Sequence, residues 1–272
     1  MFFLESYSLK QLEILDEETI LNMLTIQMDM GIDMVIRDNI SDVKEELINN
    51  VKEKTFENSL ITNPEKKAYD IALKAQDISD LERLFRNFDD CHLKKTANKF
   101  VIYEGKVNSK ILIIDGTPES DEDKEGRPLV GDKGKLFEKM LKAINLKRED
   151  VFIVNSIPWR PPGNRYPTNE EINICRPFVF NLISLLDPKI ILCMGEVATN
   201  QILDLNESII KSRGKWYVLK NPSFYKFKKS INKQQVLPTF SLSYLLKRPE
   251  TKKQAWEDMK MLRDKIKETI EM

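Results

Sequence analysis

A short apolar run followed by a polar loop is the feature that most constrains the fold of this chain. Residues 111–114 read ILII, which is typical of a strand buried on both faces of a parallel sheet. A polar segment with glycine and proline follows at 115–131, and the apolar spacing at 135–144 then predicts a helix. Because open α/β sheets bind ligands at the carboxyl ends of parallel strands, we place the functional site on this loop.

Strand-like and helix-like segments alternate through the rest of the chain. We expect strands at residues 100–104, 110–114, 151–155, 189–194, 216–219 and 235–239, and helices at 78–85, 135–144, 170–186, 196–203, 244–246 and 252–270. Strands that alternate with helices of this length predict an α/β fold, in which helices cover both faces of a mostly parallel sheet.

The first 77 residues have a different pattern, which is strongly charged and helical. Leu21, Leu24, Met28 and Ile32 recur at steps of three and four residues, so they form one apolar stripe along a helix. We place a domain boundary near Asp77. This divides the chain into a helical N-terminal extension, 1–77, and an α/β domain, 78–272.

Composition limits the partners and the compartment. Lysine plus arginine and aspartate plus glutamate both total 43, so net charge gives no argument for a nucleic-acid partner, although a basic face remains compatible with it. Three cysteines, no signal-like start and no long apolar run predict a cytoplasmic protein that does not contact membranes. The single histidine, His92, excludes a mechanism that needs two.

Three loops meet at one edge if these strands lie side by side: 115–131, 155–165 and 239–248. Asn155 ends an apolar strand, and its amide offers both a donor and an acceptor with which to read the edge of a uracil-like base. The commoner role of an asparagine at such a place is to cap a turn.

The second loop also carries Arg160 and Arg165, with two prolines and a turn at Asn164 between them. Prolines stiffen a loop, and the two guanidinium groups can reach phosphate oxygens. The alternative is that these arginines cap helix ends or pair with the acidic run 121–125. The pattern favours neither reading.

In the third loop, Ser241, Leu242 and Ser243 precede an apolar run. A leucine on such a loop can wedge into a duplex and help to extrude a nucleotide, although exposed leucines are ordinary. Basic residues interleaved with aromatic ones over 211–233 suit either a nucleic-acid surface or a solvated edge.

Together these loops resemble the family 4 uracil-DNA glycosylases of bacteria and archaea, over about residues 91–262. The matching blocks are GRPLVGDKGKLFEKML, FIVNSIPWRPPGNRYPTNEEINICRPF, DPKIILCMGEVA, IIKSRGKWY and LPTFSLSYLLKRPETKKQAWEDM, with IPWRPPGNR and CHLKKTA similar to an alphaproteobacterial branch. The resemblance implies a three-layer α/β/α sandwich around a central parallel four-stranded sheet. It also implies base-excision repair by hydrolysis of the N-glycosidic bond of deoxyuridine in DNA, a DNA partner, and a monomer.

Several family positions are substituted. The family motif GE(A/G)PG is read here from Asp115 onward as DGTPE, so Gly116 stands where the family has its active-site glutamate. Leu129 replaces the aromatic residue that stacks on uracil, and Ser241 replaces the histidine that donates to uracil O2. Of the four pocket positions that the resemblance implies, only Asn155 is kept.

These substitutions predict weak or lost activity. A lost donor to a developing oxyanion lowers a rate about 100- to 1000-fold, and a lost general base about 100- to 10,000-fold. Asp115, Glu119 or Asp121 can supply a carboxylate, and Ser241 can donate a weaker hydrogen bond. The alternatives are a non-catalytic descendant that binds DNA or a protein through the same surface, and the product of a decaying gene.

Many family members hold a four-iron–four-sulfur cluster with four cysteines. Cys91 and Cys175 match two of these positions, whereas Phe88 and Trp159 occupy the other two. Two thiolates cannot satisfy such a cluster, so we expect no cluster and no other metal.

Overall fold

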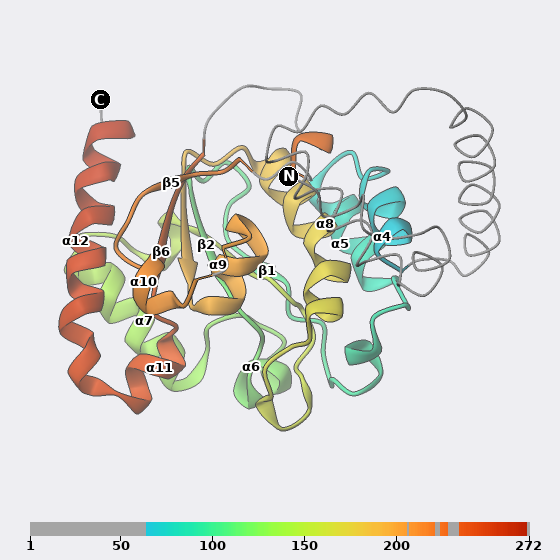
Figure 1. Ribbon diagram of the computed structural model, residues 1–272, viewed down its shortest axis with the longest axis horizontal. Coiled ribbons are helices and arrows are strands. Elements are labelled where there is room, and N and C mark those ends of the chain that lie inside the picture. The colour runs from blue at the N-terminus through green and yellow to red at the C-terminus, as the bar shows by residue number, and fades with distance from the viewer. Residues whose placement is uncertain (1–63, 206, 221–223, 228–233, 271–272) are drawn as a thin grey trace, which may run out of the picture. The chain divides into compact units, whose positions relative to one another are not determined.

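A six-stranded sheet lies at the centre of the computed structural model, which describes residues 64–205, 207–220, 224–227 and 234–270 (Figure 1). The order is β1-β3-β2-β4-β6-β5. The strands are β1 (Tyr103–Glu104), β2 (Ile111–Asp115), β3 (Phe152–Asn155), β4 (Ile190–Met194), β5 (Tyr217–Val218) and β6 (Gln235–Thr239). β3, β2, β4 and β6 run parallel, and β1 and β5 pair with the edges antiparallel. The predicted parallel sheet of four strands is therefore confirmed, with a short strand added at each edge.

Helices cover both faces of the sheet, as predicted. Side chains along β2 alternate between two cores: Leu112 and Ile114 point to one, and Ile113 to the other. The first core lies under α4 (Pro64–Ala72), α5 (Ile78–Arg86), α8 (Asn169–Leu186) and α9 (Glu196–Leu203), and the second under α7 (Gly131–Ala143), α11 (Leu242–Lys247) and α12 (Lys252–Thr269). Figure 1 shows α7 and α12 on one side of the sheet and α4, α5 and α8 on the other.

The polar loop after β2 contains a short helix that the sequence pattern did not predict. This helix, α6 (Ser120–Glu125), begins with a capping box between Glu119 and Glu122 and ends at Gly126, which has a left-handed conformation. The remaining short elements are α10 (Ile209–Ser212), η2 (His92–Lys95), η3 (Arg148–Asp150), η4 (Pro162–Asn164), η5 (Phe224–Lys226) and η6 (Pro249–Thr251). α6 buries carboxylates rather than an apolar stripe, so it has no helical periodicity to detect.

The N-terminal part of the described chain packs against α8. Ala68 and Ala72 of α4 are fully buried, and Asn181 Nδ2 of α8 donates to the carbonyl oxygen of Ala72. The described residues belong to one compact unit that begins at Thr62, while the apolar stripe that contains Leu21 lies outside them. The domain boundary near Asp77 stays a prediction. Over the described residues, no helix has the length and apolar character to cross a membrane.

Candidate active site

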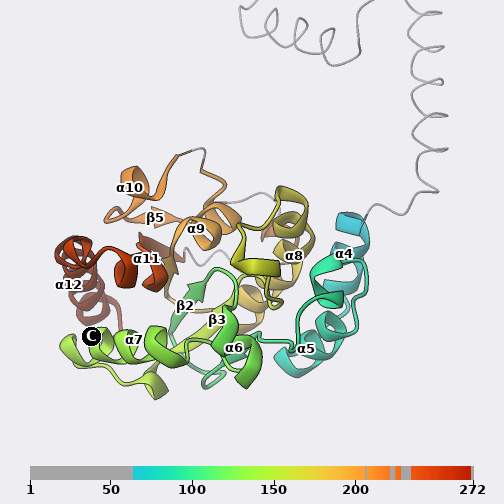
Figure 2. The same cartoon turned by 90° about the horizontal axis from the view of Figure 1, so that it is seen from below.

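A cavity of about 490 Å³ opens at the carboxyl ends of β2, β4 and β6. Asp115, Gly195 and Ser241 contribute to its floor, because each lies at or just after the end of one of these strands. Its walls come from α9, α10, α11, the start of α6 and residues 164–167. Figure 2 shows α6, α9 and α11 around β2. The structure therefore brings the first and third predicted loops together at the expected edge of the sheet, with part of the second.

A buried ion-paired cluster forms one wall of this cavity. Lys133 Nζ lies 2.9 Å from Asp115 Oδ2 and 2.9 Å from Glu122 Oε2. Glu122 also accepts hydrogen bonds from the backbone amides of Leu129 (2.7 Å) and Glu119 (2.8 Å). Lys133 and Asp115 line the cavity, whereas Glu122 lies behind them. Three separate elements, β2, α6 and α7, thus supply one charged cluster.

The start of α7 explains how Lys133 reaches the end of β2. A Cβ atom on Gly134 would lie 2.3 Å from the carbonyl oxygen of Leu129, so only glycine allows the first turn of α7 to approach the preceding loop this closely. Lys133 lies directly before Gly134 in the first turn of α7, and both residues are buried. The helix begins at Gly131, four residues before the predicted start.

The cluster favours charge on the lysine. Burial by itself would lower the pKa of Lys133, but the carboxylates of Asp115 and Glu122 raise that pKa above its ordinary value. Burial raises the pKa of Glu122, an effect that Lys133 opposes and Asp115 reinforces. Lys133 is therefore an ammonium at neutral pH.

Gly116 leaves no side chain at the family's glutamate position. Its carbonyl oxygen accepts hydrogen bonds from Ser156 Oγ (3.0 Å) and the amide of Ile157 (3.2 Å), which fix the turn after β2. A Cβ atom there would lie 3.3 Å from Cβ of Val197. A larger residue at 116 therefore requires Val197 to move.

Asn155 is fully buried at the end of β3. Its Nδ2 donates to the carbonyl oxygen of Val101 at 3.0 Å, while its Oδ1 has no hydrogen-bond partner among the described residues. In the register of β2 and β3 it pairs with Asp115. Paired residues of neighbouring strands point to the same face of a sheet, so these two side chains are neighbours.

The third loop caps α11. Ser241 lines the cavity and its Oγ accepts from the amide of Tyr244 at 3.3 Å, which is an N-cap interaction. Ser243 also lines the cavity, and its Oγ donates to Glu119 Oε1. Leu242, by contrast, is fully buried in the core beneath α11. The expectation that Leu242 is an exposed wedge does not hold in this structure, because helix α11 turns that side chain inward.

Leu129 is likewise part of the core rather than of the cavity wall. It is 1% exposed, has a left-handed backbone conformation (φ 51°), and packs in the same core as Leu242. Arg148 holds this turn, because its guanidinium donates to the carbonyl oxygens of Pro128 (2.6 Å) and Leu129 (3.0 Å). In this conformation Leu129 has almost no surface with which to contact a base.

Both arginines of the second loop have acidic partners. Arg165 makes two hydrogen bonds to Glu171 at the start of α8, and it lines the cavity together with Asn164. Arg160 Nε donates to Asn164 Oδ1 at 2.7 Å, and its Nη1 lies 3.9 Å from Asp123 of the acidic run. Arg160 thus lies near the acidic run 121–125, as the second interpretation expects, whereas Arg165 pairs with Glu171, which is outside that run.

Sequence reasoning missed Lys133 and Glu122. In the sequence they are two of many charges between residues 115 and 135, and a charge run is usually a solvated face. The available signal was the glycine pair Gly131 and Gly134, because closely approaching backbones bury the residues between them. Sequence reasoning also missed Tyr166 and Ile210, two large side chains that line the cavity and are 53% and 67% exposed.

Cys91 and Cys175, which match two cluster positions of the family, are adjacent and buried. The Cys175 thiol donates a hydrogen bond that lowers the pKa of Cys91, while burial raises the pKa of Cys175 well above its ordinary value. The ring centroid of Trp159 lies 5.2 Å from that of Phe85. The ring of Phe88 packs against that of Phe178 in α8. These residues do not fit a four-iron–four-sulfur cluster, because two positions hold packed rings in place of thiolates. No group of three or more metal-ligating side chains occurs in the described chain.

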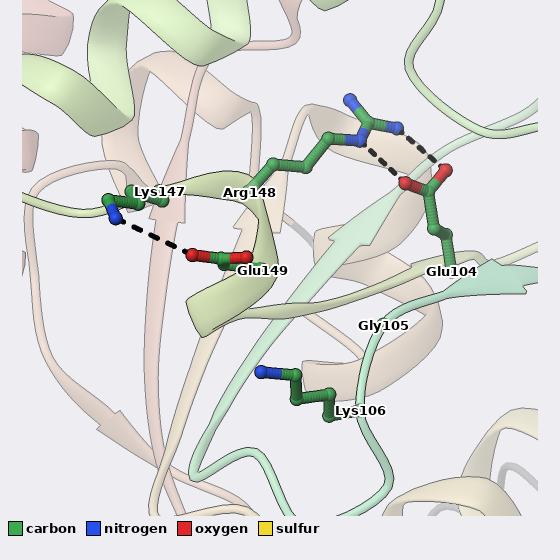
Figure 3. A pocket seen from close by; sticks show the side chains of 6 residues that line it. All are labelled: Glu104, Gly105, Lys106, Lys147, Arg148 and Glu149. Atoms are coloured by element: carbon green, nitrogen blue, oxygen red, sulfur yellow. Dashed lines mark hydrogen bonds and ion pairs between the residues drawn. The ribbon is translucent and has the colours of Figure 1, made fainter.

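A second cavity, of about 480 Å³, lies at the opposite end of β3 (Figure 3). It is lined by residues 104–106 and 147–149, and Arg148 forms two hydrogen bonds with Glu104 across it. None of the predicted site residues lines it.

Comparison with known proteins agrees with this fold and site. The profile of the Uracil DNA glycosylase superfamily matches residues 102–260, which contain the sheet and the residues of the larger cavity. The type-4 uracil-DNA glycosylase of Sulfurisphaera tokodaii is 39% identical over 179 residues, which are 64% of this chain and 78% of that protein. The type-4 uracil-DNA glycosylase of Archaeoglobus fulgidus is 30% identical over 191 residues, 69% of this chain and 92% of that protein. The chain therefore belongs to the uracil-DNA glycosylase superfamily and, within it, to family 4.

Proposed function

We propose that this protein excises uracil from DNA, at a rate well below that of family members with the full set of pocket residues. The observation that carries the proposal is the unpaired, buried Oδ1 of Asn155, which lies next to Asp115 of the cavity floor. A buried acceptor without a partner is costly. The N3–H group of uracil can donate a hydrogen bond to Asn155 Oδ1. Binding of the base therefore offsets the free-energy cost of leaving this acceptor unpaired in the free protein.

The cavity provides groups for the other parts of the substrate. Ser241 can donate to uracil O2 as negative charge develops there, and carboxylates on the cavity wall can orient water or stabilise a cationic sugar. Arg165 and Lys247 on the rim suit the phosphates on either side of an extruded nucleotide. The relatives' name, type-4 uracil-DNA glycosylase, supports uracil as the base.

The slow rate follows from the substitutions. A neutral hydroxyl is a weaker donor than the histidine that the family has at position 241, and a charge-assisted bond is about twice as strong as a neutral one. Leu129 is buried and offers no aromatic face for stacking. Since such losses are not additive, we expect a measurable residual rate.

A second candidate is a protein that binds DNA without cleaving it. The observation that favours it is the complete burial of Asn155 together with its hydrogen bond to Val101. In this interpretation, the hydrogen bond of Asn155 holds the segment before β1 in place. The cavity then binds a nucleotide without cleaving its N-glycosidic bond.

The test is excision from a single-stranded oligonucleotide with one uracil, followed by alkaline cleavage of abasic sites. A single strand removes the cost of opening a duplex. We expect slow cleavage that Asn155→Ala abolishes. A revertant with Gly116→Glu, Leu129→Phe and Ser241→His, combined with Val197→Ala to make room for Glu at 116, should be faster. Salt-sensitive binding by the native protein without any product would refute the enzyme and support the second candidate.

A further inference from the structure

The buried cluster of Lys133, Asp115 and Glu122 has no counterpart in the pocket positions that the family resemblance assigns. Its three side chains are 8%, 4% and 1% exposed. Removing charged groups from water is unfavourable, and Lys133 is held by two carboxylates at the wall of a cavity. Buried charged groups that line a cleft are candidates for a functional site.

We propose that Asp115 is the catalytic carboxylate of uracil excision and that Lys133, anchored by Glu122, is the residue that positions it. This inference rests on the proposed function. Asp115 directly precedes Gly116, where the family has its glutamate, and lies beside Asn155 in the register of β2 and β3. The carboxylate has thus moved by one residue along the same strand end.

Glu122, Asp121 and Glu119 are less suited to this role. Glu122 accepts from two backbone amides and from Lys133, so its oxygens are occupied. Asp121 is exposed and is not among the described residues that line the cavity. Glu119 does line the cavity, but its Oε1 accepts a hydrogen bond from the hydroxyl of Ser243. Asp115 uses Oδ2 for Lys133 and has Oδ1 for a water.

The reaction balances with these groups alone. The bond between C1′ of the sugar and N1 of uracil breaks, and its electron pair leaves with the base. A water oxygen forms the new bond to C1′, and Asp115 accepts the proton that this water loses. The proton then passes to the departing uracil anion, which leaves the carboxylate ionised for the next turnover.

Lys133 holds the carboxylate of Asp115 in place, because its Nζ lies 2.9 Å from Asp115 Oδ2 and 2.9 Å from Glu122 Oε2. Without the ammonium, two buried carboxylates would face each other with no counter-ion between them. The other charged groups that face the cavity are Glu119 and Glu196 on one hand, and Arg165 and Lys247 on the other. Among the described charged groups that line this cavity, Lys133 is the one that donates a hydrogen bond to Asp115.

The experiment measures the steady-state rate of uracil excision from a single-stranded oligonucleotide over a range of oligonucleotide concentrations, with the full chain. Asp115→Asn should lower the rate about 100- to 10,000-fold. The double variant Lys133→Met with Glu122→Gln avoids leaving two unpaired carboxylates, and should lower kcat about 100-fold with little change in KM. If Lys133 had only a structural role, the double variant would have a lower thermal stability and an unchanged kcat in the folded protein.

Lys135→Met is the matched control, since Lys135 lies on the same helix but is 75% exposed and pairs with the nearby Asp132. It should excise uracil as the native protein does. If Asp115→Asn retains the native rate, or if only Glu119→Gln loses it, the inference is wrong while the proposed function stands. If the native chain releases no uracil, both are wrong. Trapping of Lys133 on an abasic oligonucleotide by borohydride would show that it is a nucleophile and overturn its positioning role.

Discussion

At the scale of single residues, Glu104 and Arg148 join the edge of the sheet to the turn that carries Leu129. Arg148 donates to both oxygens of Glu104 (Figure 3). It also donates to the carbonyl oxygens of Pro128 and Leu129. One partly buried guanidinium therefore fixes three segments. The turn at Leu129 in turn positions the start of α7, where Lys133 lies.

This arrangement predicts a pH-dependent contribution to stability. Hydrogen bonds from Arg148 and Arg127 hold the pKa of Glu104 below its ordinary value of 4.5. The stabilisation is therefore fully present above pH 4.5 and is lost as pH falls through the lower folded-state pKa. Glu104→Gln should reduce the free energy of unfolding by about 1 to 3 kcal/mol at pH 7, and the difference from the native protein should shrink in acid.

Urea denaturation at several pH values measures this difference. Glu149→Gln is the control, because Glu149 is 62% exposed and pairs with Lys147 at 3.6 Å, which is worth less than about 1 kcal/mol. An effect of Glu104→Gln that stays constant down to pH 3 would contradict the assignment.

At the scale of elements, aromatic rings pack between α5, α8 and the loop after β3. The rings of Phe85 and Phe178 are stacked with centroids 4.0 Å apart, and Trp159 packs edge-on against Phe85. Cys91 and Cys175 lie in the same apolar core. Ring packing therefore joins α5, α8 and the loop after β3.

This predicts that the aromatic ring matters more than the thiol. Trp159→Ala should reduce the free energy of unfolding by about 3 to 5 kcal/mol, whereas Cys91→Ala should cost about 1 kcal/mol, close to the loss of a small buried hydrophobe. Purified protein should contain no iron by elemental analysis and show no visible absorbance. Iron near stoichiometry, lost in Cys91→Ala, would reverse this conclusion.

At the scale of the whole molecule, the net charge is zero, so the proposed binding of DNA must depend on the local distribution of charge around the cavity. Lys247 is exposed at its rim, while Lys147 lines the second cavity at the far end of β3. If single-stranded DNA crosses the larger cavity, only the first of these lysines contacts a phosphate.

We therefore expect Lys247→Gln to weaken binding of a single-stranded oligonucleotide and to reduce the slope of log K against log salt by about one. Lys147→Gln, the matched control, should leave both unchanged. Fluorescence anisotropy at several salt concentrations measures the two quantities. Equal effects of the two substitutions would place the DNA elsewhere.

The sequence by itself determined the alternation of strands and helices, the parallel sheet and the edge at which the site lies. These follow from local patterns, since an apolar run such as residues 111–114 needs burial on both faces wherever it is placed. It also indicated Asn155, Ser241 and Asp115, because residues that end strands are found at the same edge of a parallel sheet.

Only the tertiary structure decided which of these side chains face the cavity. Leu129 and Leu242 belong to turns and short helices, whose orientation depends on contacts with α7, α12 and Arg148 rather than on neighbours in sequence. In the sequence alone, Lys133 has the pattern of a solvent-exposed charge. The tertiary structure brings two carboxylates to it, one from β2 and one from α6. Burial of a charged or apolar side chain is set by partners distant in sequence, so local pattern cannot supply it.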